Sequence, residues 1–119
     1  MTDPAIDPAC IEQLLAINPE DGGEFLRELV EIFLSDTPRR LEEMTGALLT
    51  GDGPLLSRTA HSIKGGCGNF GATPLMVLAE AIEGHGKAAR FDQVRTLLPD
   101  FEAEFARVRL ALEKVAAGT

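Results

Sequence analysis

The sequence predicts an all-α protein, an antiparallel four-helix bundle with a short extra helix at its N-terminus. Three observations support this prediction. Apolar residues recur at intervals of three and four along most of the chain, which is the period of an amphipathic helix. Gly- and Pro-containing stretches divide the pattern into segments joined by short connections, as in an antiparallel bundle. No segment alternates apolar and polar residues over any length, so no sheet is expected.

Length and charge narrow the class of protein. A chain of 119 residues is long enough for one hydrophobic core and too short for two, so we expect one domain over residues 1–119. The formal net charge is −8, and the first 50 positions hold 11 acidic residues against 3 basic ones. This acidic excess disfavours nucleic acid or an anionic membrane as a partner. A solvated acidic face that keeps the protein soluble is the simplest interpretation.

The sequence also predicts a reduced, cytoplasmic and monomeric protein. Cys10 and Cys67 are too few for a disulfide framework. The first ten residues, MTDPAIDPAC, lack the basic start and the apolar run of an export signal. The longest unbroken apolar run, Leu75 to Ala79, is far shorter than a membrane span.

The first helix is predicted to follow a frayed end at residues 1–6. Asp7 is a good N-cap, and Pro8 suits the first position of a helix because its fixed φ is already helical. The helix should continue to about Ile17, since Asn18-Pro19 ends it. Its apolar side comprises Ile11, Leu14 and Leu15.

The second helical pattern contains a proline. Apolar residues keep the helical period from Phe25 to Phe33 and again from Leu41 to Leu48. Asp36-Thr37-Pro38 lies between the two parts, so either one long helix kinks at Pro38 or two helices meet there. Gly51-Asp52-Gly53-Pro54 then marks a stop and a new start.

Three helices remain. The third is predicted from Leu55 to about Phe70. Gly71-Ala72-Thr73-Pro74 separates it from the fourth, in which Thr73 should be the cap and Gly84-His85-Gly86 the end. The last helix starts near Phe91 and continues to about Val115, with Pro99 expected to bend or restart it.

The third helix carries the candidate functional residues, in the stretch AHSIKGGCGNFGA at positions 60–72. At about 100° per residue, one apolar stripe falls within an arc of about 80°. This stripe comprises Leu56, Ala60, Ile63, Cys67 and Phe70. His61 lies about 140° from Leu56 and should therefore face solvent. The residues within about 60° of His61 are Arg58, Lys64, Gly65 and Gly68.

The glycines of this helix need a reason, because each costs roughly 1 kcal/mol relative to alanine in a helix interior. Gly65 and Gly68 leave a face without side chains beside His61, so the surface of another protein can approach the imidazole. Gly66 does not face that side. Helix packing or an early end of the helix would account for it.

An exposed histidine between two cations suits phosphoryl chemistry. Neutral imidazole is a nucleophile, and a phosphoryl group on His61 would meet the positive charges of Lys64 and Arg58. The chain has no Gly-rich strand–loop–helix for ATP phosphates, so it is not expected to charge the histidine itself. The two histidines and two cysteines lack ligand spacing, and no metal site is expected. His85 is interpreted as a polar residue at a helix C-terminus.

The same stretch resembles the signature of the histidine-containing phosphotransfer (Hpt) domain family, which reads roughly as His, two residues, Lys-Gly, five residues and Gly. The matching residues are His61, Lys64, Gly65 and Gly71. Downstream, LAEAIEG is similar to the second motif of the family, and FLSDTPRRLEEMTGALLTGD to its preceding helix and turn. The resemblance covers about residues 20–116. Many members carry Ser or Ala at the three positions after Gly65, where this chain has Gly, Cys and Gly.

This resemblance implies a phosphorelay intermediate rather than an enzyme with its own nucleotide site. His61 would accept a phosphoryl group from a receiver-domain aspartate, through the ring nitrogen remote from the backbone, and pass it to another receiver. Lys64 would stabilise that group, and Gly65 would give clearance. Glu83 would accept a hydrogen bond from the other ring nitrogen and fix the tautomer.

The resemblance also implies the partners. They would be receiver domains of response regulators and of a hybrid histidine kinase, docking on a surface that includes Arg58, Gly65 and Gly68. Magnesium would belong to the receiver, and no cofactor is expected on this chain.

Two other functions are open at this point. A helical module could bind receiver or kinase domains without transferring phosphate, although such a binder has no need for an unblocked histidine. A histidine-dependent phosphatase would need a second acid or base on the face of His61, and the sequence places none there.

Overall fold

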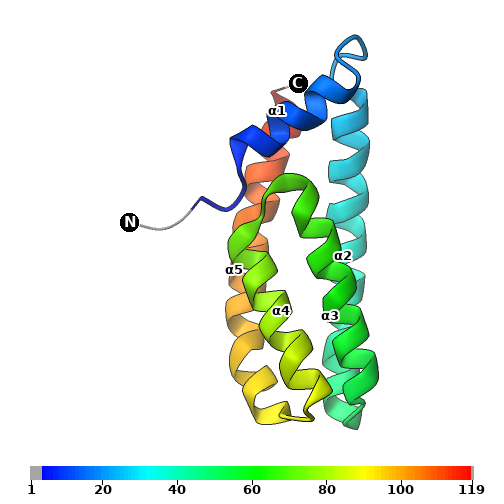
Figure 1. The fold of residues 1–119 in the computed structure, drawn as a ribbon, viewed down its shortest axis with the longest axis vertical. Coiled ribbons are helices and arrows are strands. Elements are labelled where there is room, and N and C mark those ends of the chain that lie inside the picture. Colours follow the sequence, from blue (N-terminus) through cyan, green and yellow to red (C-terminus); the bar gives the residue numbers. More distant parts are fainter. Residues whose placement is uncertain (1–3, 119) are drawn as a thin grey trace.

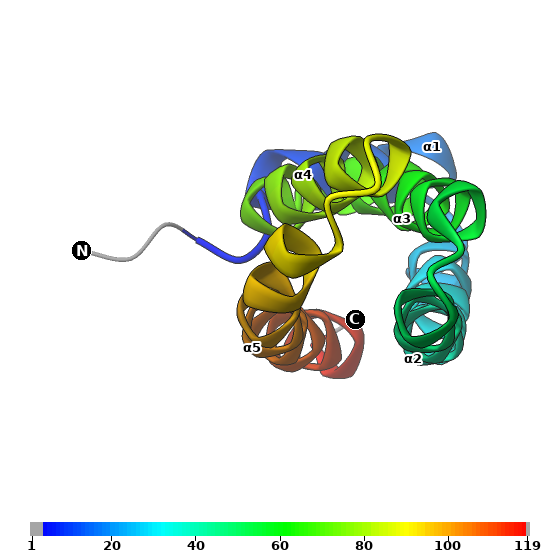
Figure 2. The same ribbon diagram turned by 90° about the horizontal axis from the view of Figure 1, so that it is seen from below.

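The computed structural model describes residues 4–118, and all regular structure in this range is helical. Four long helices run antiparallel, and a short N-terminal helix lies across one end of them (Figure 1). Seen from the end, the long helices surround a common interior (Figure 2). The predicted four-helix bundle with an extra N-terminal helix is thus confirmed. In chain order the elements are α1 (Pro8–Ile17), α2 (Glu24–Thr50), α3 (Gly53–Cys67), the 3-10 turn η1 (Gly68–Phe70), α4 (Thr73–Lys87) and α5 (Phe91–Ala117).

The N-terminal segment is more ordered than the sequence predicts. Asp7 caps α1 as expected, since its carboxylate accepts a hydrogen bond from the Ala9 N–H at 2.9 Å. Ala5 and Ile6, predicted to be frayed, instead pack partly buried against the core. The reason is an anchor to η1, because the Asp7 N–H donates to the carbonyl of Phe70 at 3.0 Å. The rest of the predicted frayed end that precedes Pro4 lies outside the described residues.

Gly71 makes that anchor possible. Its φ of +60° is left-handed, a conformation that glycine adopts without steric cost. A Cβ at this position would lie 2.5 Å from Cβ of Asp7 and 2.9 Å from Sγ of Cys10. Gly71, the last residue of the signature that the sequence resembles, therefore ends η1 and leaves room for the start of α1.

Both internal prolines lie inside continuous helices. α2 is unbroken across Pro38, so the alternative of two abutting helices is wrong. α5 is equally continuous across Pro99, so this proline does not restart the helix. Proline removes a backbone hydrogen bond in a helix interior, but each of these helices buries an apolar face on both sides of its proline. Packing therefore overrides the local preference.

Three predicted helix ends are corrected. The α-helical part of the third helix ends at Cys67, and the next three residues form η1. Thr73 is not the cap of α4, because Ala72 occupies the cap position and Thr73 is already helical. Gly84-His85-Gly86 does not end α4, which continues to Lys87. The chain reverses only afterwards, at Ala89, whose φ is +57°.

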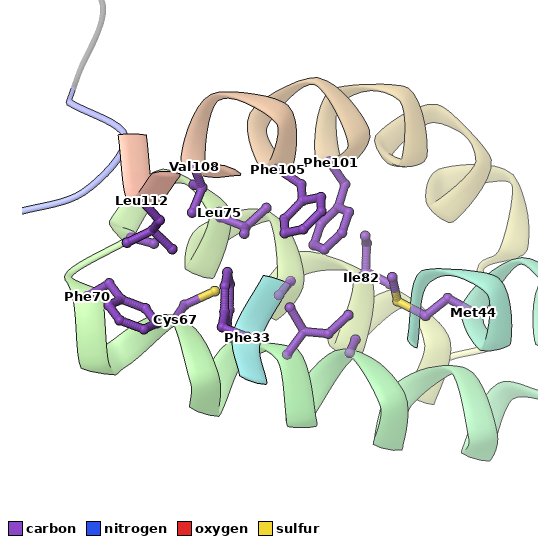
Figure 3. Close-up of a cluster of buried hydrophobic side chains, with 14 of the residues drawn as sticks. Phe33, Met44, Cys67, Phe70, Leu75, Ile82, Phe101, Phe105, Val108 and Leu112 are labelled. Carbon is purple, nitrogen blue, oxygen red and sulfur yellow. The ribbon is translucent and has the colours of Figure 1, made fainter. Parts of the chain in front are cut away.

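The core lies between the long helices and includes the whole predicted stripe of α3. Leu56, Ala60, Ile63, Cys67 and Phe70 are each at most 2% exposed. Phenylalanines from three elements meet in this core (Figure 3). The ring of Phe33 packs edge-on against Phe70, with centroids 5.4 Å apart, and against Phe105 at 6.0 Å.

Because the apolar stripe of α3 is buried in the core, the opposite face of this helix is directed toward solvent.

Within residues 4–118, no helix combines the length and the apolar character needed to cross a bilayer.

Candidate functional site

His61 projects from the outer face of α3, with its side chain 65% exposed. The helix begins at a defined point because the carboxylate of Asp52 accepts a hydrogen bond from the Leu55 N–H at 3.1 Å. Ala60 and Ile63, which lie near His61 in the sequence but belong to the apolar stripe, are buried. The rotation of α3 is thus set by its apolar stripe, and the imidazole is directed outward.

Glu83 of α4 meets this histidine from the adjacent helix. Its Oε2 lies 3.0 Å from Nδ1 of His61, and its Oε1 lies 3.1 Å from Nζ of Lys64. The side chain of Glu83 is only 12% exposed, and that of Lys64 is 28% exposed. The three residues predicted to form the reactive group are therefore brought together, with one carboxylate bridging two side chains of α3.

The charge of Glu83 determines which nitrogen of His61 is free. Burial on its own would raise the pKa of Glu83, but the hydrogen bond and charge of Lys64, together with His61, outweigh it and hold this pKa below its ordinary value of 4.5. Glu83 is thus ionised at neutral pH, and an ionised carboxylate can only accept hydrogen bonds. The proton between the two groups belongs to Nδ1, so in the neutral ring Nε2 holds a free lone pair.

Sequence reasoning missed Lys87. Its Nζ lies 3.7 Å from Oε2 of Glu83, and its side chain is 69% exposed. A surface hollow beside His61 is lined by residues of both helices: Pro54, Ser57, Arg58, His61, Glu83 and Lys87. The signal was present in the sequence, because a Glu and a Lys four residues apart are neighbours on one helix face. Arg58 of α3 and Lys87 of the adjacent α4 thus place two cations around the same hollow.

The predicted open face is present beside the histidine. A Cβ added at Gly65 or at Gly68 would meet no atom of the described residues within 4 Å, other than its own local backbone. Gly66 differs, because a Cβ there would lie 3.2 Å from the ring of Phe33. Both explanations left open for Gly66 find support, because it packs against Phe33 and the α-helix ends one residue later, at Cys67.

The second histidine takes part in a different contact. Nδ1 of His85 accepts a hydrogen bond from Nε of Arg90 at 3.0 Å, in the last turn of α4. In the part of the chain that the structure describes, no group of three or more His, Cys, Asp or Glu side chains is arranged to hold a metal ion.

Comparisons with known proteins identify the family and the fold of this chain. The sequence model described as "Hpt domain" matches residues 28–118. The phosphorelay intermediate protein YPD1 of Candida albicans is 28% identical over 87 residues, which are 73% of this chain and 47% of that protein. The chain therefore spans about half the length of this curated relative.

The fold comparison covers more of the chain. The crystal structure of histidine-containing phosphotransfer protein B (HptB) from Pseudomonas aeruginosa PAO1 superimposes with a TM-score of 0.88 and 28% sequence identity, over 99% of both chains.

Proposed function

The chain belongs to the Hpt domain family, and on that premise we propose that it is a phosphorelay intermediate in which His61 carries the phosphoryl group. One observation carries the choice of residue. The carboxylate of Glu83 is hydrogen-bonded to Nδ1 of His61 at 3.0 Å, and the imidazole ring is largely exposed. The nucleophilic nitrogen Nε2 is thus free on the surface of the protein.

The proposed step is an exchange between two phosphorylated side chains. Nε2 of His61 attacks the phosphorus of a receiver-domain aspartyl phosphate, a nitrogen–phosphorus bond forms, and the bond from phosphorus to the aspartate oxygen breaks. The aspartate leaves as a carboxylate, and the Nδ1 proton stays in its hydrogen bond to Glu83. Attack by the aspartate of a second receiver on the same phosphorus reverses these bond changes and restores neutral His61.

Cations around the ring supply the electrostatics of this step. Lys64 is paired with Glu83 at 3.1 Å and stands one helical turn from His61. Arg58 and Lys87 line the hollow beside the imidazole. Positive side chains that are already in place lower the energy of a transition state in which negative charge accumulates on phosphoryl oxygens.

The proposed partners are receiver domains of response regulators and of a hybrid histidine kinase, which would act in the cytoplasm. They would dock on the surface formed by Arg58, Gly65 and Gly68. Their own site would hold the Mg²⁺ that the aspartyl phosphate needs. We also propose that residues 1–119 act as a single Hpt-like domain, with its core at about residues 20–116.

The test is transfer from a radiolabelled phospho-receiver to the protein, with receivers of the source organism charged by a small phosphodonor. We expect acid-labile, base-stable label on the parent and on His85→Gln, and none on His61→Gln. Circular dichroism checks that His61→Gln is folded, as its exposed position predicts. Label retained on folded His61→Gln would refute the assignment, and binding of receivers without any label on the parent would favour a non-transferring module.

A further inference from the structure

α3 and α4 are in close contact at two glycines near the His61–Glu83 pair. Gly53 is the first residue of α3, and Gly86 lies in the last turn of α4. A Cβ at Gly53 would lie 2.6 Å from the carbonyl oxygen of Gly86. A Cβ at Gly86 would lie 3.2 Å from the backbone nitrogen of Ser57 and 3.4 Å from the carbonyl oxygen of Gly53. Backbone therefore packs close to backbone here, and the side chain of Leu56 borders the contact, with its Cγ 3.3 Å from a Cβ at Gly86.

This contact is connected to the reactive pair by rigid helical geometry. Gly86 follows Glu83 by three residues, and Ser57 precedes His61 by four, so each pair lies one turn apart on one side of its helix. The two helices lie side by side in both views of the bundle (Figures 1 and 2). Their separation at the glycines therefore determines how far the α4 carboxylate lies from the α3 imidazole.

We propose that Gly53 and Gly86 are positioning residues, which set the distance between Nδ1 of His61 and the carboxylate of Glu83 and thereby the tautomer of His61. The effect on phosphotransfer rests on the function proposed above. The effect on the tautomer does not.

The margin for movement is small. The present Nδ1–Oε2 distance is 3.0 Å, and hydrogen bonds of this type weaken beyond about 3.2 Å. The atoms that a new Cβ at Gly86 would meet include backbone atoms of α3, which can move only with the helix. The backbone of Glu83 belongs to α4, whereas its two carboxylate oxygens contact His61 and Lys64 of α3 at 3.0 and 3.1 Å, so separating the two helices stretches both contacts. A few tenths of an ångström of helix separation therefore act directly on this hydrogen bond.

The test compares Gly86→Ala with Gly84→Ala, a matched control on the same helix. A Cβ at Gly84 would meet nothing within 4 Å among the described residues, so this variant changes helix propensity without changing the helix contact. Gly86→Ala is preferred to Gly53→Ala because its contacts of 3.2–3.4 Å call for a small shift rather than a clash of 2.6 Å. Circular dichroism and the thermal midpoint establish that both variants fold.

The decisive readout is the nitrogen-15 spectrum of the His61 ring. We expect the parent and Gly84→Ala to show one neutral tautomer, protonated at Nδ1, and Gly86→Ala to show a mixture of both tautomers. Transfer should fall about three- to tenfold in Gly86→Ala, which corresponds to about 0.6–1.4 kcal/mol in the barrier. Gly84→Ala should transfer like the parent.

A double-mutant cycle separates positioning from simple packing. If Gly86 acts through Glu83, Gly86→Ala should cost no further transfer in a Glu83→Ala background. A lowered thermal midpoint with an unchanged tautomer would overturn the proposal, as would additive losses in the cycle. If the parent takes no label at all, the proposed function fails, and the tautomer comparison still decides whether the glycines position the pair.

Discussion

Oε2 of Glu83 lies 3.0 Å from Nδ1 of His61, although the two residues are 22 positions apart in the chain and belong to different helices. Glu83 of α4 thus orients the ring, and the rotation of α3 exposes it to solvent. As a result, Nδ1 is hydrogen-bonded within the protein, and Nε2 is accessible to a partner.

Removing the acceptor should release the tautomer. In Glu83→Ala we expect a mixture of neutral His61 tautomers and a loss of transfer of about tenfold, equivalent to about 1.4 kcal/mol. Glu83→Gln keeps an oxygen that can accept from Nδ1, so it should retain most of the preference for that tautomer and lose less activity. Nitrogen-15 spectra and transfer rates are the measurements. Parent-like transfer by Glu83→Ala would show that the hydrogen bond has no functional role.

Lys64 should contribute to the rate through charge. Because interactions between partly exposed charges amount to a few kcal/mol at most before screening, Lys64→Ala should slow transfer about ten- to a hundredfold, or about 1.4–2.7 kcal/mol. Lys87→Ala is the comparison, and its effect should be smaller because Lys87 is farther from Glu83 and more exposed. Rates are measured at low and at high salt. An unchanged rate for Lys64→Ala at low salt would contradict the electrostatic role.

The sequence predicts the outward direction of the His61 side chain, because a buried stripe fixes the rotation of its helix. Once Ile63 and Cys67 face inward, the outward direction of His61 follows from helical geometry alone. Glu83 required the family resemblance as well, because its contact with His61 depends on the register between α3 and α4. A one-helix pattern contains no information on that register.

The same limit applies to the helix boundaries, because packing between helices is not visible in a local sequence pattern. Local propensity predicts that Gly84-His85-Gly86 ends the helix, whereas α4 includes all three residues and ends at Lys87, and Gly86 packs on α3. At Pro38 the sequence allows either one long helix or two abutting helices. The structure has one unbroken helix, because α2 buries apolar residues on both sides of the proline. Local preferences of about 1–3 kcal/mol are thus overridden where a helix buries an extensive apolar face.

The two cysteines should differ sharply in reactivity. Cys67 is fully buried, and its burial raises the pKa of the thiol to about 12. Cys10 is only partly buried. Because the thiolate is the reactive form, iodoacetamide at about pH 8 should label Cys10 and spare Cys67 until denaturant is added. Mass spectrometry of timed samples measures this. Equal labelling rates in the native protein would show that the core around Cys67 opens readily.

Acid should weaken the contribution of Glu83 to stability. Its folded-state pKa lies below the ordinary value of 4.5, so its contribution is fully present above that value and is lost as the pH falls through the folded pKa. Urea unfolding of the parent and of Glu83→Gln between about pH 6 and pH 3 tests this. The parent should be the more stable protein at about pH 6, and the difference should shrink below pH 4.5. A difference that stays constant across this range would mean that the charge of Glu83 does not stabilise the fold.

The glycines beside His61 should show opposite effects on stability and on transfer. Gly65 is helical with open space around it, so Gly65→Ala should stabilise the isolated protein by about 0.5–1 kcal/mol. The added methyl group should nevertheless slow transfer, because it occupies the face where a receiver approaches. The same pattern is expected for Gly68→Ala, and Gly65→Gln should impair transfer severely without abolishing folding.

Gly66 is the matched control for this argument, one position along the same helix. Its Cβ would lie 3.2 Å from the Phe33 ring, so Gly66→Ala should gain no such stability. Transfer should remain near the parent rate, because this position faces the core and not His61. Thermal midpoints and transfer rates of the single variants decide the matter. If Gly65→Gln transfers as fast as the parent, close approach is not the reason for Gly65, and the cost that glycine imposes on α3 must have another cause.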